Sequence, residues 1–180
     1  DSSIKAELGE ASDACQAGSF AFIADGSIQP GLRYLPLRYA AFAYLTQVIS
    51  QGARAVQNGI LKSFPHADLG LLVIWISMMS GDTCEAAQTA AGKFADKRVK
   101  QFYDPRQLAG RAFAKSLGHD DRVAWDIYLF YPPGAQWRDL PPQPEEFMHQ
   151  LRDGWADQRR LFEDERLRAK LTETMKLLFP

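Results

Sequence analysis

The chain has 180 residues, of which 46% are hydrophobic and 24% are charged, and its formal net charge at pH 7 is −1. A chain of this length can bury a core as one domain without metal ions or disulfides. The balanced charge argues against a nucleic-acid partner, which requires a basic surface. No apolar run in the sequence approaches the roughly 20 residues of a membrane-spanning helix.

The N-terminal part, residues 1–36, is predicted to be an extension that contains a hairpin. Residues 19–24, Asp25-Gly26 and Ser27-Ile28 together are typical of two short strands joined by a type I′ turn. The glycine and prolines that follow predict a connector rather than a regular element.

The next two elements are predicted to be a buried strand and a helix. Residues 38–46 form an aromatic and apolar run, which favours a strand. Residues 51–63 place Ala53, Val56 and Ile60 at helical spacing, and Pro65 follows the end of the segment.

The central stretch runs from Gly70 to Glu85. Its first half is a continuous apolar run with β-branched and aromatic residues, which is typical of a parallel strand buried on both faces. Its second half predicts a helix start, in which Asp82 and Glu85 form a capping box. The expected helix then extends to about Asp96.

The following segments repeat this alternation of strand and helix. Residues 98–103 predict a strand, and Asp104-Pro105 predicts an N-cap followed by the first helical position. This helix is expected to end at Gly118.

The C-terminal third is predicted to contain a hairpin and helices. Residues 123–131 predict a strand, Pro132-Pro133-Gly134 a turn, and residues 135–138 the returning strand. The chain from Glu145 onward is expected to be helical, and residues 156–180 to form a C-terminal helix packed on the same domain.

The fold class is therefore α/β, with a mixed sheet flanked by helices. The order of elements in residues 37–155 resembles the redoxin form of the thioredoxin-like fold. The resemblance includes Ala124-Trp125-Asp126, with Tyr103-Asp104-Pro105 before it and residues 147–151 after it. This set is similar to a group of uncharacterised bacterial thioredoxin-like proteins, and it implies a thioredoxin-like domain over residues 37–155.

The resemblance also shows what the sequence lacks. Redoxins carry a cysteine pair where the first strand meets its helix, and here Gln47 and Ser50 have that spacing. The segment that matches the family's cis-proline, residues 122–125, contains no proline. The implied protein is redox-inactive at this junction, because thiol–disulfide exchange requires thiols there. Gln47 and Ser50 remain binding candidates.

The only two cysteines, Cys15 and Cys84, are far apart in the sequence, and only the fold can show whether they pair. Cys84 follows the central strand at the predicted helix start, where a thiolate is stabilised. The carboxylates of Asp82 and Glu85 oppose that effect, so an ordinary or raised thiol pKa is expected. Cys84 is the candidate catalytic residue, and a small packing residue is the alternative.

Trp125, Asp126 and His119 are the remaining binding candidates. A carboxylate that opens an apolar strand has to be bonded to backbone or paired, for example with Arg138, or else it binds a ligand beside the aromatic ring. His119 precedes two aspartates, in either a solvated turn or a carboxylate–imidazole cluster. The three histidines have no metal-ligand spacing, and His149 is expected at the surface or in an interface.

Three functions follow from these residues. The first is a redox-inactive binding or scaffold protein, the second a thiol-dependent oxidoreductase or peroxidase that uses Cys84, and the third a small-molecule or metal-binding protein at the edge formed by His119 and Asp126. The expected partner is a protein or small-molecule ligand, with a homodimer as an alternative and without a cofactor. The compartment stays open between cytoplasmic and periplasmic or secreted.

Overall fold

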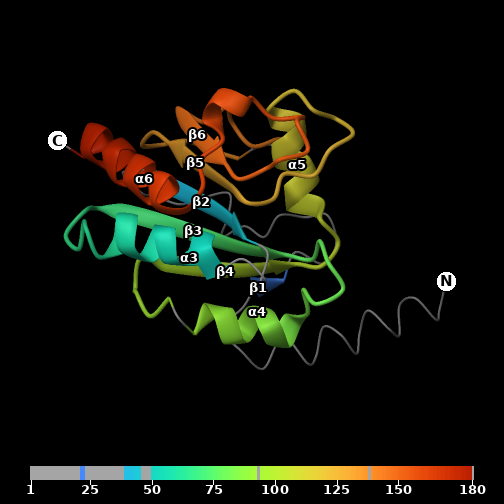
Figure 1. Cartoon of the computed structure of the whole chain (residues 1–180), viewed down its shortest axis with the longest axis horizontal. Helices are drawn as coiled ribbons and strands as arrows, with labels where there is room; N and C mark the ends of the chain where they lie inside the picture. The colour runs from blue at the N-terminus through green and yellow to red at the C-terminus, as the bar shows by residue number, and fades with distance from the viewer. Residues whose placement is uncertain (1–20, 23–38, 46–49, 93, 138, 180) are drawn as a thin grey trace.

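The computed structural model describes residues 21–22, 39–45, 50–92, 94–137 and 139–179. Its centre is a six-stranded mixed sheet with the order β1-β4-β3-β2-β5-β6 (Figure 1). The strands are β1 (Ala21–Phe22), β2 (Tyr39–Leu45), β3 (Leu69–Ile76), β4 (Val99–Asp104), β5 (Ile127–Tyr131) and β6 (Glu146–His149). The helical segments are α3 (Ser50–Val56), the π-helical η1 (Gln57–Leu61), α4 (Cys84–Ala91), α5 (Leu108–Ser116), the 3-10 turn η2 (Gln158–Arg160) and α6 (Asp164–Leu178).

The central strand predicted from the apolar run is confirmed. All eight residues of β3 are buried, and β3 pairs in parallel with both β2 and β4. Strands β5 and β6 complete the sheet in antiparallel pairing, so the prediction of a mixed α/β sheet is also confirmed. In the described part of the chain, no helix has the length and apolarity needed to cross a membrane.

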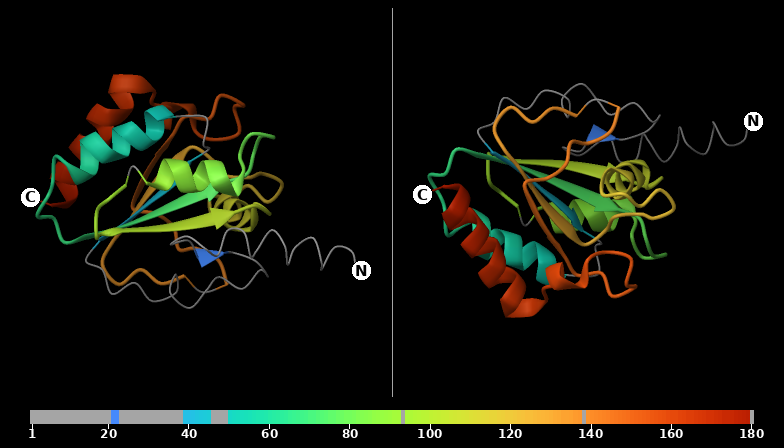
Figure 2. Two further views of the ribbon diagram at one scale, coloured as in Figure 1. Left: turned by 90° about the horizontal axis from the view of Figure 1, so that it is seen from below. Right: turned by 90° about the horizontal axis from the view of Figure 1, so that it is seen from above.

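The side chains of β3 alternate between two separate clusters. Leu71, Val73 and Trp75 pack with side chains from α3, α4 and α6, whereas the residues between them pack with α5. Helices α3 and α6 lie side by side in both views of Figure 2. The apolar run lacks a period because both faces of β3 are covered.

A close helix contact holds α6 on the segment formed by α3 and η1. The Thr172 hydroxyl donates to the carbonyl of Gly59 at 3.1 Å, and a Cβ at Gly59 would lie 3.0 Å from the carbonyl oxygen of Arg168. Glycine therefore permits the approach, and Leu167, Leu171 and Met175 of α6 are buried.

Arg98 stabilises the end of η1 from the start of β4. Its guanidinium donates to the carbonyls of Phe64 at 2.6 Å and Leu61 at 3.1 Å, and it pairs with Asp96 at 2.7 Å. The hydrogen bond from Arg98 lowers the pKa of Asp96, although burial opposes it. Arg98 thus supplies donors to the carbonyl of the last residue of η1 and to a carbonyl of the turn that follows it.

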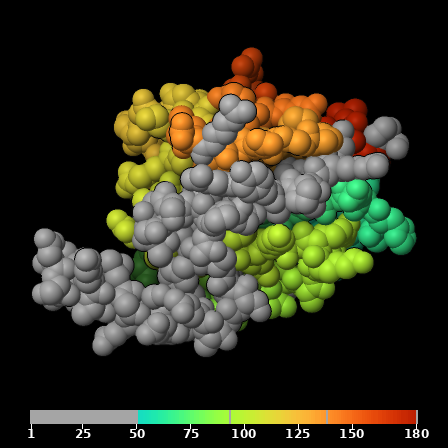
Figure 3. Space-filling view, turned by 180° about the vertical axis from the view of Figure 1, so that it is seen from behind, coloured from blue at the N-terminus to red at the C-terminus, as the bar shows by residue number. Residues whose placement is uncertain are grey.

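The predicted C-terminal hairpin is wrong in its second strand. Residues 135–137 are not a strand, and β6 is formed by the segment from Glu146 that was expected to be helical. The indole of Trp137 packs edge-on against the Phe113 ring, with the ring centroids 4.8 Å apart. The chain therefore turns inward toward α5 before it returns to the sheet as β6. Residues 132–137 and 139–145 form part of the surface seen from behind (orange in Figure 3).

The N-terminal hairpin is only partly described. Ala21 and Phe22 pair in parallel with Phe102 and Tyr103 of β4, at one edge of the sheet. The predicted turn and second strand lie outside the described residues.

A buried glycine of α5 provides a test of the packing beneath β3. A Cβ at Gly110 would lie 2.7 Å from Cδ1 of Ile76 and 2.7 Å from Cγ1 of Val123. Gly110→Ala is expected to lower the free energy of unfolding by about 1–3 kcal/mol, because the added methyl group overpacks the core. Chemical denaturation measures the change, and Gly81→Ala is the control because a Cβ at Gly81 would have no heavy atom within 4 Å beyond its own chain neighbours.

Ile76→Val removes the Cδ1 methyl group and should cost about 0.5–1.5 kcal/mol on its own. The double variant should lose less stability than the two single losses added together. Full additivity would contradict the contact between Gly110 and Ile76.

Candidate functional site

The candidate site lies at the edge of the sheet where β3 and β4 end and β5 begins. Ile76 pairs with Asp104 at the ends of β3 and β4, and Ile127 at the start of β5 pairs with Tyr44 near the end of β2. Open α/β sheets place ligands outside the carboxyl ends of their parallel strands. Residues 77–83, 105–107 and 123–126 therefore form the described part of this edge.

Asp104 holds the start of α5. Its carboxylate is buried and accepts hydrogen bonds from the backbone N–H groups of Leu108 at 2.9 Å, Ala109 at 2.9 Å and Gly110 at 3.3 Å. Burial raises the pKa of Asp104, and these backbone donors oppose the increase. Asp104 is not the N-cap residue that the sequence predicts, because Gln107 holds that position, but its carboxylate still satisfies donors of the first turn.

The predicted helix start at Pro105 is wrong. Helix α5 begins at Leu108, after Gln107, whose backbone is left-handed with φ of 58°. The Asp104 carboxylate reaches across an additional turn formed by residues 105–107, which a short capping pattern does not reveal. This turn brings the Gln107 side chain to the neighbouring loop, where its Nε2 donates to the carbonyl of Ser77 at 2.8 Å.

Tyr103 makes a second connection between the loops. Its hydroxyl donates to the carbonyl of Asp82 at 2.9 Å. Burial is the main cause that raises the pKa of Tyr103, and a hydrogen bond with Ser77 opposes it. Gln107 thus joins the loop after β4 to the loop after β3, and Tyr103 joins β4 to that same loop; the sequence analysis predicted neither hydrogen bond.

The sequence predicts Asp82 as the N-cap of α4, in a capping box with Glu85, but the N-cap lies one residue later. Thr83 is the N-cap and accepts from the N–H of Ala86 at 3.3 Å. The carboxylate of Asp82 instead accepts from the N–H groups of Met78 at 3.0 Å and Met79 at 2.8 Å. Asp82 therefore closes the loop after β3, and Met79 remains 43% exposed at that loop.

Cys84 is the first residue of α4 and is disulfide-bonded. The candidate catalytic residue therefore has no thiol in this structure, and its expected thiol pKa does not apply to this state. Cys15, the other cysteine of the chain, lies outside the described residues.

The structure describes one of the two residues that have the spacing of the redoxin cysteine pair. Gln47 lies outside the described residues, and Ser50 is the first residue of α3. Helix α3 begins at Ser50, one residue before the helix start that the sequence predicts, and it is the next described element after β2.

Trp125 and Asp126 lie immediately before β5 rather than within it, because β5 begins at Ile127. Asp126 is buried, with φ of 47°, and its carbonyl accepts from the N–H of Gln150 at 2.9 Å. Burial and the Asp126 carboxylate together raise the pKa of Tyr128, and burial is the larger cause. The expected partner Arg138 lies outside the described residues.

His119 and Asp126 have different neighbours. The His119 ring packs edge-on against Trp155 with centroids 4.8 Å apart, and its backbone N–H donates to the carbonyl of Ala114. Asp120, next to His119, lies 3.9 Å from Lys115 in an exposed ion pair. In the described ranges, no group of three or more histidine, cysteine, aspartate or glutamate side chains could hold a metal ion.

His149 corrects a sequence prediction. It was expected at a helix start on the surface, but it belongs to β6 and is fully buried. Strand β6 has only four residues and follows a segment rich in proline. Its alternation of side chains is too short to be recognised in the sequence, so the sequence alone could not place this imidazole.

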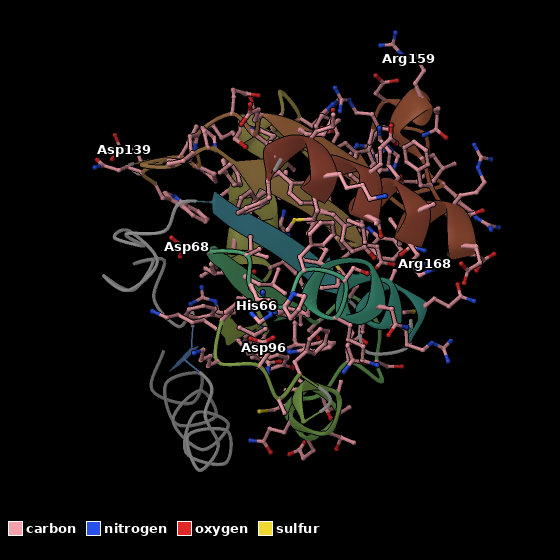
Figure 4. All side chains as sticks on the ribbon, turned by 90° about the vertical axis from the view of Figure 1, so that its left-hand side faces the viewer. His66, Asp68, Asp96, Asp139, Arg159 and Arg168 are labelled. Carbon is pink, nitrogen blue, oxygen red and sulfur yellow. The ribbon has the colours of Figure 1, made fainter. Side chains whose placement is uncertain are left out.

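A separate pocket of about 250 Å³ lies between α3 and α6. Arg54 of α3 and Arg168 of α6 line it, and Arg168 is labelled in Figure 4. Arg168 is also paired with Glu165 at 2.7 Å. Glu165 also lines the pocket, and the remaining lining residues are Gln51, Ala55, Asn58 and Asp164.

Comparisons of the chain with protein-family models, with curated proteins and with solved structures found no match.

The capping role of Asp104 is measurable. Asp104→Ala is expected to lower the free energy of unfolding by about 1–3 kcal/mol, because it leaves buried N–H groups of α5 without an acceptor. Asp104→Asn should cost less, since it keeps one acceptor and removes a buried charge. Asp139, exposed and labelled in Figure 4, provides a control, and Asp139→Ala should change stability by less than about 0.5 kcal/mol. Equal losses for Asp104→Ala and Asp139→Ala would refute the role.

The state of Cys84 is measurable by thiol titration. The denatured protein should bind no thiol reagent before reduction, and reduction should expose the two cysteines of the chain. A thiol that reacts at Cys84 without prior reduction would contradict the disulfide.

Proposed function

We propose that the chain has a thioredoxin-like arrangement and acts as a binding module without dithiol chemistry at the junction of β2 and α3. The strand order supports this proposal, since β2 lies between β3 and β5 and is followed by α3. Residues 46–50 contain no cysteine, and Cys84 on α4 is held in a disulfide. The ligand would be a protein or a small molecule.

The observation that carries the binding proposal is the edge beyond β3 and β4, where hydrogen bonds hold the loops in place. Gln107 and Tyr103 tie its two loops together, and Asp82 fixes the loop that exposes Met79. A preformed surface loses less conformational entropy on binding than a flexible one. Half-buried Trp125 lies at the same edge, so the ligand would contact an apolar surface.

Disulfide exchange at Cys84 is the second candidate. Cys84 occupies the first position of α4, where the helix N-terminus stabilises a thiolate and so makes the thiol a better leaving group. A disulfide also favours an oxidising compartment for this protein, periplasmic or secreted. Ligand binding by His119 and Asp126 jointly has less support, because the two residues have different neighbours.

Insulin reduction driven by dithiothreitol distinguishes the first two functions. The wild-type protein is expected to leave the rate at its uncatalysed value, because the junction of β2 and α3 has no thiol pair. Catalysis that disappears in Cys84→Ser would favour the second candidate. Catalysis that survives Cys84→Ser would show that the site has been misplaced.

A gain-of-function variant tests the thioredoxin-like arrangement itself. Replacing Gln47 and Ser50 with cysteines should create a disulfide at the start of α3 and raise the rate of insulin reduction above that of the wild type. The matched control is Glu173→Cys with Lys176→Cys, which has the same spacing on an exposed part of α6. Equal rates for the two double variants would contradict the arrangement; mass spectrometry identifies which cysteines pair.

A further inference from the structure

Residues 150–162, here called the strap, fold back along the outer edge of β6. The N–H of Phe162 donates to the carbonyl of His149 at 3.0 Å, and Leu161 forms a parallel bridge with His149. The Arg160 guanidinium donates to the carbonyl of Phe147 at 2.9 Å and lies over the Phe147 ring, 4.3 Å from its centroid. The strap thus occupies carbonyls that an edge strand would otherwise leave open to pairing.

The His149 side chain joins β6 to both ends of a loop in the strap. Its Nδ1 lies 3.1 Å from the backbone N of Leu151, and its Nε2 lies 3.0 Å from the carbonyl oxygen of Asp157. A backbone N–H can only donate and a carbonyl can only accept. Nδ1 must therefore be unprotonated and Nε2 must carry the hydrogen, so the imidazole is neutral and in one tautomer.

Protonation would break this arrangement. A hydrogen on Nδ1 would face the N–H of Leu151, and the hydrogen bond between them would be lost. A positive charge would also be placed on a fully buried side chain. Both effects favour a state in which the imidazole reaches water.

The surrounding charges have opposite effects on the imidazole. Asp153 and Asp157 of the strap favour the protonated form, and Arg160 opposes it. On the β5 side, the cross-strand partner Ile127 is uncharged, and Asp126 directly precedes it. Burial is the largest cause and lowers the pKa of His149 below its usual value of 6.5.

We propose that His149 is a pH-sensitive latch, which holds the strap against β6 at neutral pH and releases it on acidification. The released strap exposes the edge of β6. The open state binds the proton at an ordinary histidine pKa, whereas the closed state binds it only at lower pH. The opening equilibrium constant therefore rises by up to about tenfold for each pH unit below 6.5, until the closed state is also protonated.

Titration of the Asp157 carboxylate does not account for an opening of the strap at the pH values at which a histidine titrates. The hydrogen bond from Arg159 lowers the pKa of Asp157 to about 2, so its carboxylate stays ionised throughout. Arg159 itself points away from the body of the molecule (Figure 4).

Hydrogen exchange of the backbone amides between pH 7.5 and 5, corrected for the intrinsic pH dependence of exchange, tests the latch. The amides of Leu151 and Phe162 should lose protection reversibly as the pH falls, by up to about tenfold per unit below pH 6.5. Amides of β3, such as that of Val73, should stay protected and show that the domain remains folded. Unchanged protection of the strap in the folded wild type would overturn the proposal.

His149→Gln provides the matched variant. A glutamine side chain has one donor and one acceptor to replace Nε2–H and Nδ1, but it does not titrate in this range. It should abolish the pH dependence of the strap, whereas His66→Gln, at an exposed histidine, should leave it unchanged. Persistence of the pH dependence in His149→Gln would contradict the latch.

The wild-type protein gives a decisive measurement even if His149→Gln fails to fold. Nitrogen-15 NMR of the His149 ring should show the neutral Nε2–H tautomer at pH 7.5 and a titration that coincides with the loss of strap protection. Titration of His149 without any change in the amides of Leu151 and Phe162 would exclude it as the latch.

Discussion

The burial of β3 on both faces is the constraint on which the rest of the structure depends. Its side chains pack into two separate hydrophobic clusters, one on each face of the sheet, so helices are needed on both sides. Full burial of a leucine or isoleucine contributes about 1.5–3 kcal/mol, whereas an exposed ion pair contributes about 0–1 kcal/mol. The charged helix α6 is therefore held mainly by Leu167, Leu171 and Met175, and its exposed ion pairs, such as Lys170 with Glu173, add little.

Buried or half-buried polar side chains fix the places where the chain enters and leaves this sheet. Asp104 and Asp82 accept backbone N–H groups at the carboxyl edge, Arg98 donates to carbonyls after η1, and His149 bonds to the backbone of the strap. A buried polar group without a partner costs about 1–3 kcal/mol, so each of these residues favours one loop conformation over others. The same bonds that specify the loops also make the proposed binding edge rigid.

The proposed binding function and the alternative at Cys84 occupy the same edge of the sheet. Cys84 begins α4 directly after the loop that Asp82 closes, so a change of its redox state would act on a helix next to the exposed Met79. The latch at His149 lies on β6, at the edge of the sheet, and responds to protons rather than to electrons. The two features can therefore be separated by experiment, because one requires reduction and the other requires acid.

The sequence by itself determined the elements whose signals are local. The apolar run of β3 and the aspartate before α5 each identify an element, because burial on two faces and backbone capping leave a pattern within a few residues. Only the tertiary structure decided the position of β6, the burial of His149, the tight contact at Gly110 and the bond from Gln107 to Ser77. These features depend on contacts between segments that are distant along the chain, and a short strand beside prolines carries no periodic signal of its own. The neighbours of Gly110, Ile76 and Val123, become identifiable only when the sheet and α5 meet.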